Sequence, residues 1–253
     1  MSAGPIQLSA PFGAPTIGRE QSAGPIQLSA PFGAPTIGPV RTAVLISGRG
    51  SNMAALLAAA AQPSYPAEIA LVLSNRADAA GLATAQAVGI ATAVVESRGF
   101  KGNRAAFEAA MQAELERHDI QLIALAGFMR VLTESFVRAW EGRMLNIHPS
   151  LLPSFPGLET HERALAAGVR LHGCTVHLVS PGVDEGPILA QAAVPVLPED
   201  TATSLAARVL EQEHRLYPAA LAWLAAGRVT LHEGRALVAD ALPAQAALAN
   251  PLP

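Results

Sequence analysis

The stretch that decides the fold is "TAVLISGRGSN", Thr42 to Asn52, in which an apolar run leads directly into a short glycine-containing turn. A continuous apolar run of this length is typical of a strand that is covered on both faces of its sheet. An alanine- and leucine-rich segment follows immediately. The pattern therefore predicts a strand, a tight turn and a helix in succession.

The same alternation continues along the chain. After the first strand and helix, strands are expected over residues 69–75, 92–96 and 121–127, with helices over 79–88, 103–118 and 133–140. Strand and helix alternating at this spacing indicate parallel βαβ units, with helices on both faces of the sheet.

In the C-terminal half of the chain, strands and helices no longer alternate regularly. A strand begins at Met144, a helix is expected near 159–168, two adjacent strands at 172–179 and 188–196, and a long closing helix over 201–226. Two strands without an intervening helix suit a mixed continuation of the sheet. We predict one α/β domain with an open, mostly parallel sheet.

Composition excludes several classes of protein. The chain has 253 residues, 51% hydrophobic and 15% charged, and a net charge of −3 without a basic run, which argues against nucleic-acid and membrane-surface binding. Cys174 is the only cysteine, so no internal disulfide can form, as suits a reducing compartment. No apolar segment reaches membrane-spanning length and no signal peptide is recognisable. We expect a cytoplasmic protein.

The ends of the chain look different from its middle. Residues 2–18 recur identically as residues 22–38, and two copies so rich in Pro and Gly are too few for a stacked repeat fold. We expect residues 1–40 to be a disordered leader, 41–235 the folded domain, and 236–253 a flexible tail. Whether the duplicated leader is native stays open.

The turn after the first strand is a candidate phosphate site. Gly50, Ser51 and Asn52 sit at the start of the first helix, where glycines permit a tight turn and free amides can receive an anion. The pattern lacks the third glycine of a dinucleotide fingerprint, and no acid closes the second strand, so a monophosphate fits better than NAD. The alternative is a plain turn in which Ser51 caps the helix.

A second candidate site lies in "MLNIHPSLLPSFPG", Met144 to Gly157. Residues two apart in a strand point to one side, so Asn146 and His148 share a face while Ile147 is buried on the other. An amide and an imidazole together form a donor pair suited to an oxyanion. Asp184 lies in a glycine- and proline-bounded loop, where it could orient or charge His148. Taken alone, His148 or Asp184 would more readily have no catalytic role, and only their combination with Asn146 favours a site.

The loop "GFMRVL" after the strand at 121–127 falls at the carboxyl edge of the sheet, where open α/β proteins bind ligands. Its apolar residues could line a flat ligand, although Met129 or Leu132 could also be simple core. On the closing helix, Glu213 could face the sheet edge and bind a polar substrate group.

The remaining histidines carry less weight. His172 and His177 have an odd separation in one strand, so they face opposite sides and cannot chelate one metal. There is no HExxH or equivalent motif, and we predict no metal.

Taken together, these motifs resemble the glycinamide ribonucleotide transformylases (phosphoribosylglycinamide formyltransferases), folate-dependent enzymes of purine synthesis. The resemblance runs in family order from about residue 42 to 235 and is carried by "VLISGRGSN", "LSNRADAAGLATAQAVGI", "LAGFMRVL", "NIHPSLLPSFPGLETHERAL", "HGCTVHLV", "DEGPIL" and "EQEHRLYP". It implies a Rossmann-like formyltransferase fold and a formyl transfer from 10-formyltetrahydrofolate to glycinamide ribonucleotide, without a metal.

The resemblance also implies roles for individual residues. The catalytic residues would be Asn146, His148 and Asp184. The substrate-binding residues would be Gly50, Ser51, Asn52 and Glu213, and the folate-binding residues Arg104, Met129, Arg130, Val131, Leu132 and Val183. One departure is the proline in "SPGV", which precedes the aspartate.

Two other functions remain open. A formyltetrahydrofolate hydrolase would share the Asn, His and Asp but usually has an N-terminal regulatory domain, for which the leader is too short. We expect the chain not to be a methionyl-tRNA formyltransferase, because that family carries a further C-terminal domain and a basic surface for tRNA that this sequence does not show. A non-catalytic phosphate- or nucleotide-binding module would use the GRGSN loop alone. The expected partners are the two substrates, with neither nucleic acid nor membrane, in a monomer or homodimer.

Overall fold

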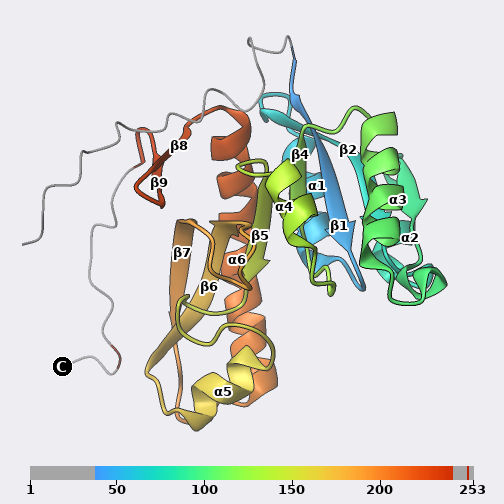
Figure 1. Cartoon of the computed structure of the whole chain (residues 1–253). Helices are drawn as coiled ribbons and strands as arrows, with labels where there is room; N and C mark the ends of the chain where they lie inside the picture. The colour runs from blue at the N-terminus through green and yellow to red at the C-terminus, as the bar shows by residue number, and fades with distance from the viewer. Residues whose placement is uncertain (1–37, 242–249, 251–253) are drawn as a thin grey trace, which may run out of the picture.

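The computed structural model describes residues 38–241 and residue 250 (Figure 1). Nearly all of the predicted leader, and most of the predicted tail, lie outside the described residues.

One seven-stranded sheet organises the domain. Its strands, in spatial order, are β3 (Thr92–Val94), β2 (Ala67–Ser74), β1 (Val40–Ile46), β4 (Leu122–Leu125), β5 (Met144–His148), β6 (Leu171–Leu178) and β7 (Ile188–Pro195). The first five in this order pair with one another in parallel, and β6 pairs antiparallel with both β5 and β7. The predicted open, mostly parallel sheet with a mixed continuation is confirmed.

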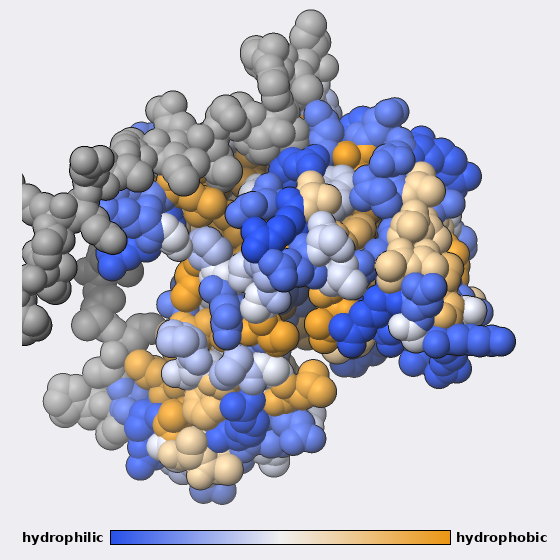
Figure 2. All heavy atoms as spheres, in the orientation of Figure 1, coloured by the Kyte–Doolittle hydropathy of each residue, from blue (hydrophilic) through white to orange (hydrophobic). Residues whose placement is uncertain are grey.

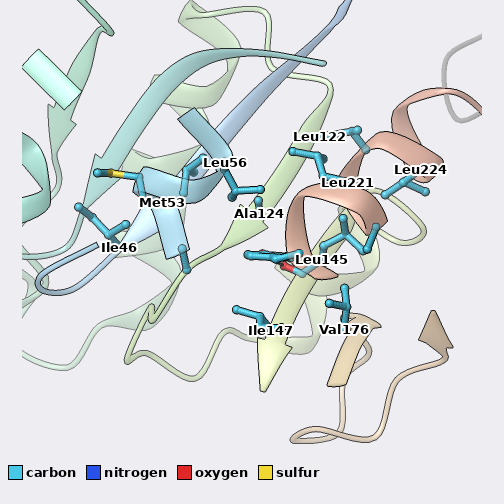
Figure 3. Packing of buried hydrophobic residues seen from close by; sticks show 14 of the residues in the cluster. Ile46, Met53, Leu56, Leu122, Ala124, Leu145, Ile147, Val176, Leu221 and Leu224 are labelled. Carbon is cyan, nitrogen blue, oxygen red and sulfur yellow. Dashed lines mark hydrogen bonds between the residues drawn. The ribbon is translucent and has the colours of Figure 1, made fainter. Parts of the chain in front are cut away.

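Helices cover both faces, as the continuous apolar strands predicted. They are α1 (Ser51–Ala60), α2 (Ala80–Ala87), α3 (Arg104–Arg117), α4 (Glu134–Ala139), α5 (Thr160–Ala166) and α6 (Ala202–Ala225). The core on one face includes residues of α1, α2 and α6, and the core on the other includes residues of α3 and α4. Strand residues alternate between the two cores: Leu145 and Ile147 join Leu221 of α6 (Figure 3), whereas Met144 faces α3 and α4.

The order in which the chain adds strands to the sheet reverses at β1, the topological switch point. The segments after β1 build outward through β2 to β3, and the chain then crosses to β4 on the other side of β1. Leu45, Leu125 and Asn146 are register partners on β1, β4 and β5. The loops after these strands therefore emerge side by side at one edge, at the lower end of the strands in Figure 1, where such folds bind ligands.

The long helix α6 is stabilised by a cap at its N-terminus and by contacts with the sheet. Thr201 and Ser204 form a reciprocal capping box at its start. Tyr217 is fully buried, and its hydroxyl donates to the carbonyl oxygens of Leu125 (2.9 Å) and Leu145 (3.3 Å). These bonds hold α6 against the ends of β4 and β5, the strands that carry the candidate site.

Two elements were not predicted from the sequence. A 3₁₀ turn, η1 (Ser97–Phe100), follows β3, and a hairpin of β8 (Val229–His232) and β9 (Arg235–Val238) follows α6. Strand β9 crosses the predicted domain boundary at residue 235. None of the helices in the described part of the chain has the length and apolar composition needed to span a bilayer.

Candidate active site

The pairing of β5 with β6 creates a polar cluster on one face of the sheet. Asn146 and His177 are direct register partners in this antiparallel pair, and His148 lies opposite Thr175. Since side chains alternate along each strand, Asn146, His148 and His177 project to the same side. The predicted convergence of Asn146 and His148 is thus present, with a second imidazole beside it.

His148 is 5% exposed and has an acceptor near each ring nitrogen. Its Nε2 lies 3.0 Å from the carbonyl oxygen of Phe155, and its Nδ1 lies 3.4 Å from Oδ2 of Asp184. A carbonyl and a carboxylate can only accept, so a ring that satisfies both must carry a proton on each nitrogen. Neither neutral tautomer can donate to both acceptors.

Asp184 reaches the cluster from the loop between β6 and β7. Its backbone is left-handed, with φ 57°, and its Oδ2 accepts a 2.9 Å hydrogen bond from the amide of Gly157. At Gly186 in the same loop, an added Cβ would lie 1.7 Å from the carbonyl oxygen of Leu178. The glycine therefore lets the loop close tightly over β6, and the carboxylate joins the loop after β5 to the imidazole of His148.

His177 is the site residue that the sequence analysis missed. Its Nδ1 lies 3.0 Å from the carbonyl oxygen of Leu178 and must donate to it, which leaves Nε2 as the acceptor for Nδ2 of Asn146 at 3.1 Å. Burial lowers the pKa of His177, so the neutral ring needed for this arrangement is the favoured form. By accepting from Nδ2, His177 fixes the orientation of the Asn146 amide in the site.

The prediction that His172 and His177 face opposite sides is confirmed. His172 lies on the other side of β6, with its Nε2 3.2 Å from Nδ1 of His161. Burial lowers the pKa of His172 to about 4. The parity argument concerned only these two histidines, and it said nothing about the register with β5 that brings His177 to Asn146.

The GRGSN turn has the geometry of an anion site. Gly50 adopts φ 74° and is itself the N-cap of α1, without a side-chain cap, so the alternative in which Ser51 caps the helix is wrong. A Cβ at Gly50 would lie 3.2 Å from Cα of Gly81, because α2 packs closely behind the turn. The first amides of α1 have no partner within the helix and carry the positive end of its dipole.

Asn52 and Glu213 meet across the domain. Nδ2 of Asn52 donates to Oε2 of Glu213 at 2.7 Å, and Glu213 is 6% exposed. Burial raises the pKa of Glu213, which the hydrogen bond from Asn52 opposes. Oδ1 of Asn52 is buried and has no partner among the described residues. The pair joins the anion turn at the head of α1 to α6.

The loop after β4 presents apolar side chains to solvent. Met129 is 67% exposed, Val131 60% and, from the Asp184 loop, Val183 57%. The loop is nevertheless anchored, because the amide of Met129 donates to Oγ of Ser47 at 2.8 Å and the amide of Thr133 to Oε1 of Glu108 at 2.6 Å. A fixed loop with exposed apolar residues beside the polar cluster suits a flat ligand.

Two of the candidate folate residues differ from this picture. Leu132 is partly buried and packs against the core, so the alternative of a core role holds for Leu132 and fails for Met129. Arg104 is exposed as the first residue of α3.

The separation between the two parts of the site follows from the strand order. The anion turn follows β1 and Asn146 belongs to β5, with only β4 between them. Two strand spacings of about 4.8 Å place them roughly 10 Å apart along the edge. An anion turn, an Asn/His/Asp cluster and an apolar loop at one sheet edge define a class of enzyme that acts on a small phosphorylated substrate with a flat co-substrate.

The comparisons with known proteins identify the family. A family model described as "Formyl transferase" matches residues 40–221. The chain belongs to the formyl transferase family.

Two relatives indicate which formyl transferases this chain is similar to. The "Phosphoribosylglycinamide formyltransferase" of Escherichia coli is 43% identical over 203 residues, which cover 80% of this chain and 95% of the relative. A "Trifunctional purine biosynthetic protein adenosine-3" from Gallus gallus is 50% identical over 194 residues, or 77% of this chain. This chain spans about a fifth, 19%, of that longer relative.

Solved structures agree with the fold. The glycinamide ribonucleotide transformylase 1 of Symbiobacterium toebii has a TM-score of 0.78 and 44% identity, covering 81% of this chain and 96% of its own. A formyltetrahydrofolate deformylase from Pseudomonas syringae has a TM-score of 0.74 but only 25% identity, covering 81% of this chain and 67% of its own. The formyltransferase fold expected from the sequence is confirmed.

Proposed function

We propose that the chain transfers a formyl group from 10-formyltetrahydrofolate to the amine of glycinamide ribonucleotide, giving N-formylglycinamide ribonucleotide and tetrahydrofolate in purine biosynthesis. The observation that carries the proposal is the meeting of Asn146, His148 and Asp184 beside the anion turn at the head of α1. The same activity is named for the Escherichia coli relative, of which this chain covers 95%.

The binding steps use the two ends of the site. The ribonucleotide phosphate binds the turn of Gly50, Ser51 and Asn52, where free amides and the helix dipole stabilise an anion. Glu213 and Asn52 receive the polar groups of the sugar. The pterin binds the apolar loop that contains Met129 and Val131, with Val183 opposite. The amine then points toward His148.

The chemical step is a balanced acyl transfer. The amine nitrogen attacks the formyl carbon, the carbonyl oxygen becomes an oxyanion, and the bond from that carbon to the folate nitrogen breaks. Asn146 and the protonated His148 stabilise the oxyanion. To donate to it, Nε2 of His148 must exchange its hydrogen bond with the carbonyl oxygen of Phe155 for one with the oxyanion. Asp184, through water, helps to move the proton from the attacking amine to the departing folate nitrogen.

One assay separates this function from its two alternatives. Purified protein is incubated with 10-formyltetrahydrofolate, and the folate absorbance is followed with and without glycinamide ribonucleotide. Turnover only in the presence of the ribonucleotide supports the proposal. Folate turnover without it supports a hydrolase, and no turnover in either case supports a phosphate-binding module. The 44% identity to a transformylase structure, against 25% to a deformylase, favours the first result.

Replacing Ser51 or Asn52 with alanine is expected to raise the KM for glycinamide ribonucleotide with little change in kcat. Both residues lie at the anion turn, away from the β5 cluster, and they contribute to binding that is equal in ground and transition states. The loss of one hydrogen bond to a charged group corresponds to a rise of about 10- to 100-fold. Steady-state kinetics with varied ribonucleotide tests this. A fall in kcat at unchanged KM would contradict the assignment.

Replacing His177 with alanine is expected to lower kcat by about 10- to 100-fold while both KM values stay nearly constant. The change leaves Nδ2 of Asn146 without its acceptor, which costs about 1–3 kcal/mol or releases the amide from its orientation. The variant His177→Gln is the matched control, since its side-chain oxygen can accept the same bond. Alanine and glutamine variants of equal activity would show that His177 does not orient Asn146.

Several expectations remain predictions. These are the metal-free reaction, the monomeric or homodimeric state, the cytoplasmic location and the division of the chain into leader, catalytic domain and tail. Among the described residues, no three His, Cys, Asp or Glu side chains are grouped so that they could hold a metal.

A further inference from the structure

The apolar loop after β4, residues 126–133, is anchored by two side chains. The amide of Met129 donates to Oγ of the buried Ser47 at 2.8 Å, and the amide of Thr133 donates to Oε1 of Glu108 at 2.6 Å. Between these anchors, the backbone of residues 130–132 makes no hydrogen bond to any residue that the structure describes. The position of this middle part therefore depends on the two anchors and on side-chain packing.

Glu108 makes the second anchor from α3. It is 5% exposed, and its carboxylate accepts from both donors of Thr133, the amide at Oε1 and the hydroxyl at Oε2. Thr133 is also the N-cap of α4, where its Oγ1 accepts from the amide of Phe136 at 3.4 Å. The preceding residue of α3, Phe107, has its ring centroid 6.0 Å from the guanidinium of Arg130. Two successive residues of α3 thus face the loop.

The burial of the Glu108 carboxylate would be costly if its oxygens had no hydrogen-bond donors. Each oxygen accepts one bond from Thr133, so the two side chains satisfy each other. An apolar residue of similar size at this position of α3 could pack in the same core, but it would leave the amide of Thr133 without its partner. The acid is therefore suited to holding the loop rather than to core packing alone.

The anchored loop carries exposed apolar side chains. It leaves the sheet at the lower end of α4 in Figure 1, where the space-filling view shows hydrophobic atoms at the surface beside hydrophilic ones (Figure 2). Met129 is itself an anchor point, and Val131 lies between the two anchors. The backbone that presents Val131 to solvent is therefore held in place by contacts behind the loop.

We propose that Glu108 is a positioning residue for the folate co-substrate, which acts through Thr133 on the apolar loop and touches no substrate itself. The inference rests on the proposed function, in which the pterin binds this loop. With the anchor in place, the loop is ordered before the pterin arrives. Without the anchor, binding has to order residues 130–133, and fixing the backbone of each residue corresponds to about a 5- to 30-fold loss of affinity.

Replacing Glu108 with alanine is expected to raise the KM for 10-formyltetrahydrofolate by about 5- to 30-fold, the cost of ordering one loop residue. The KM for glycinamide ribonucleotide should stay constant, because the anion turn follows β1 and is not held by α3. At saturating folate, kcat should change by less than about threefold, since lost preorganisation weakens binding of ground and transition states equally. An unchanged KM for the folate would overturn the proposal.

A matched control removes a different bond of the same helix. Gln112 lies one turn further along α3, and its Oε1 accepts from Nε1 of Trp140 at 2.9 Å, at the end of α4 that is distant from the loop. Gln112→Ala is expected to lower the temperature of thermal unfolding about as much as Glu108→Ala does, with both KM values unchanged. An equal rise in the KM for the folate would show that any weakening of this packing has the same effect, and would overturn the proposal.

Glu108→Gln is the conservative variant. Its side-chain oxygen can accept from the amide of Thr133, and its NH₂ group can donate to the Thr133 hydroxyl, which then donates to Oγ of Ser135 at 2.9 Å. The KM for the folate is expected to stay within about threefold of the original value. A glutamine variant as poor as the alanine variant would overturn the proposal. Glu108→Leu fills the space and still removes the anchor, so it gives the same test if Glu108→Ala does not fold.

A binding measurement keeps this proposal separate from the proposed function. Calorimetric titration with tetrahydrofolate requires neither turnover nor the ribonucleotide, and Glu108→Ala is expected to bind it about 5- to 30-fold more weakly than the unmodified protein. Weakened binding in a protein without ribonucleotide-dependent turnover would reject the proposed function and support the role of Glu108. Equal affinities of the two proteins, with normal turnover, would overturn the role of Glu108 alone.

Discussion

Replacing His148 with alanine is expected to lower kcat on the order of 10²- to 10³-fold. The imidazole lies between the carbonyl of Phe155 and the carboxylate of Asp184, and both geometry and burial prepare it to donate to an oxyanion. Loss of one such donor typically costs about 2.7–4 kcal/mol of transition-state stabilisation. Because the anion turn lies roughly two strands away, the KM for the ribonucleotide should change little. Steady-state kinetics with each substrate varied in turn measures both quantities.

The control is His232→Ala, because His232 lies on the β8–β9 hairpin with its side chain 43% exposed. It should retain full turnover. Circular dichroism and thermal unfolding of His148→Ala establish that the fold is intact. A well-folded His148→Ala variant with more than about a tenth of the original kcat would remove His148 from the oxyanion site.

Asn146→Ala offers a second view of the same centre. The two donors act on one oxyanion, so their effects on kcat should not add, as is usual for groups that act as a unit. The double variant is therefore expected to be little worse than the poorer of the two single variants. Full additivity would place Asn146 and His148 at separate points of the reaction.

The local pattern of apolar residues predicted the fold, because helices and strands each repeat their buried positions at a characteristic spacing. The sequence predicted a long closing helix over residues 201–226, and α6 occupies Ala202–Ala225. Alternation within "MLNIH" predicted that Asn146 and His148 share a face, and Leu145 and Ile147 indeed join the core on the other. The missed hairpin of β8 and β9 has short strands of mixed polarity, with half-exposed residues, and such patterns resemble loops.

The site residue that the sequence analysis missed depends on the pairing register of strands that are distant in the sequence. His177 is 31 positions from Asn146 and meets it only because β6 pairs antiparallel with β5 in one particular register. Nothing local to either strand specifies that pairing. A cavity lined in part by Arg76, Arg98 and Arg130 also depends on long-range pairing, since these residues follow β2, β3 and β4 and converge only at the edge of the assembled sheet.

Replacing Asp184 with asparagine is expected to lower kcat by about 10²- to 10⁴-fold, the usual contribution of general acid–base catalysis. Asparagine is nearly the same size, and its Oδ1 can still accept from the amide of Gly157, so the loop should keep its place. The same oxygen, Oδ2, accepts from Gly157 and lies 3.4 Å from Nδ1 of His148, so an asparagine oxygen in its place keeps both contacts. What the variant removes is the negative charge beside the imidazole, and with it the attraction that favours a positive charge on that ring during the reaction.

The variant thus separates a structural role of Asp184 from a chemical one. If the carboxylate served only to hold Gly157, asparagine would preserve turnover, and only Asp184→Ala would lose it. If its charge serves His148, both variants lose turnover while ribonucleotide binding stays intact. An Asp184→Asn variant with normal kcat would show that the proton reaches the folate nitrogen without this carboxylate.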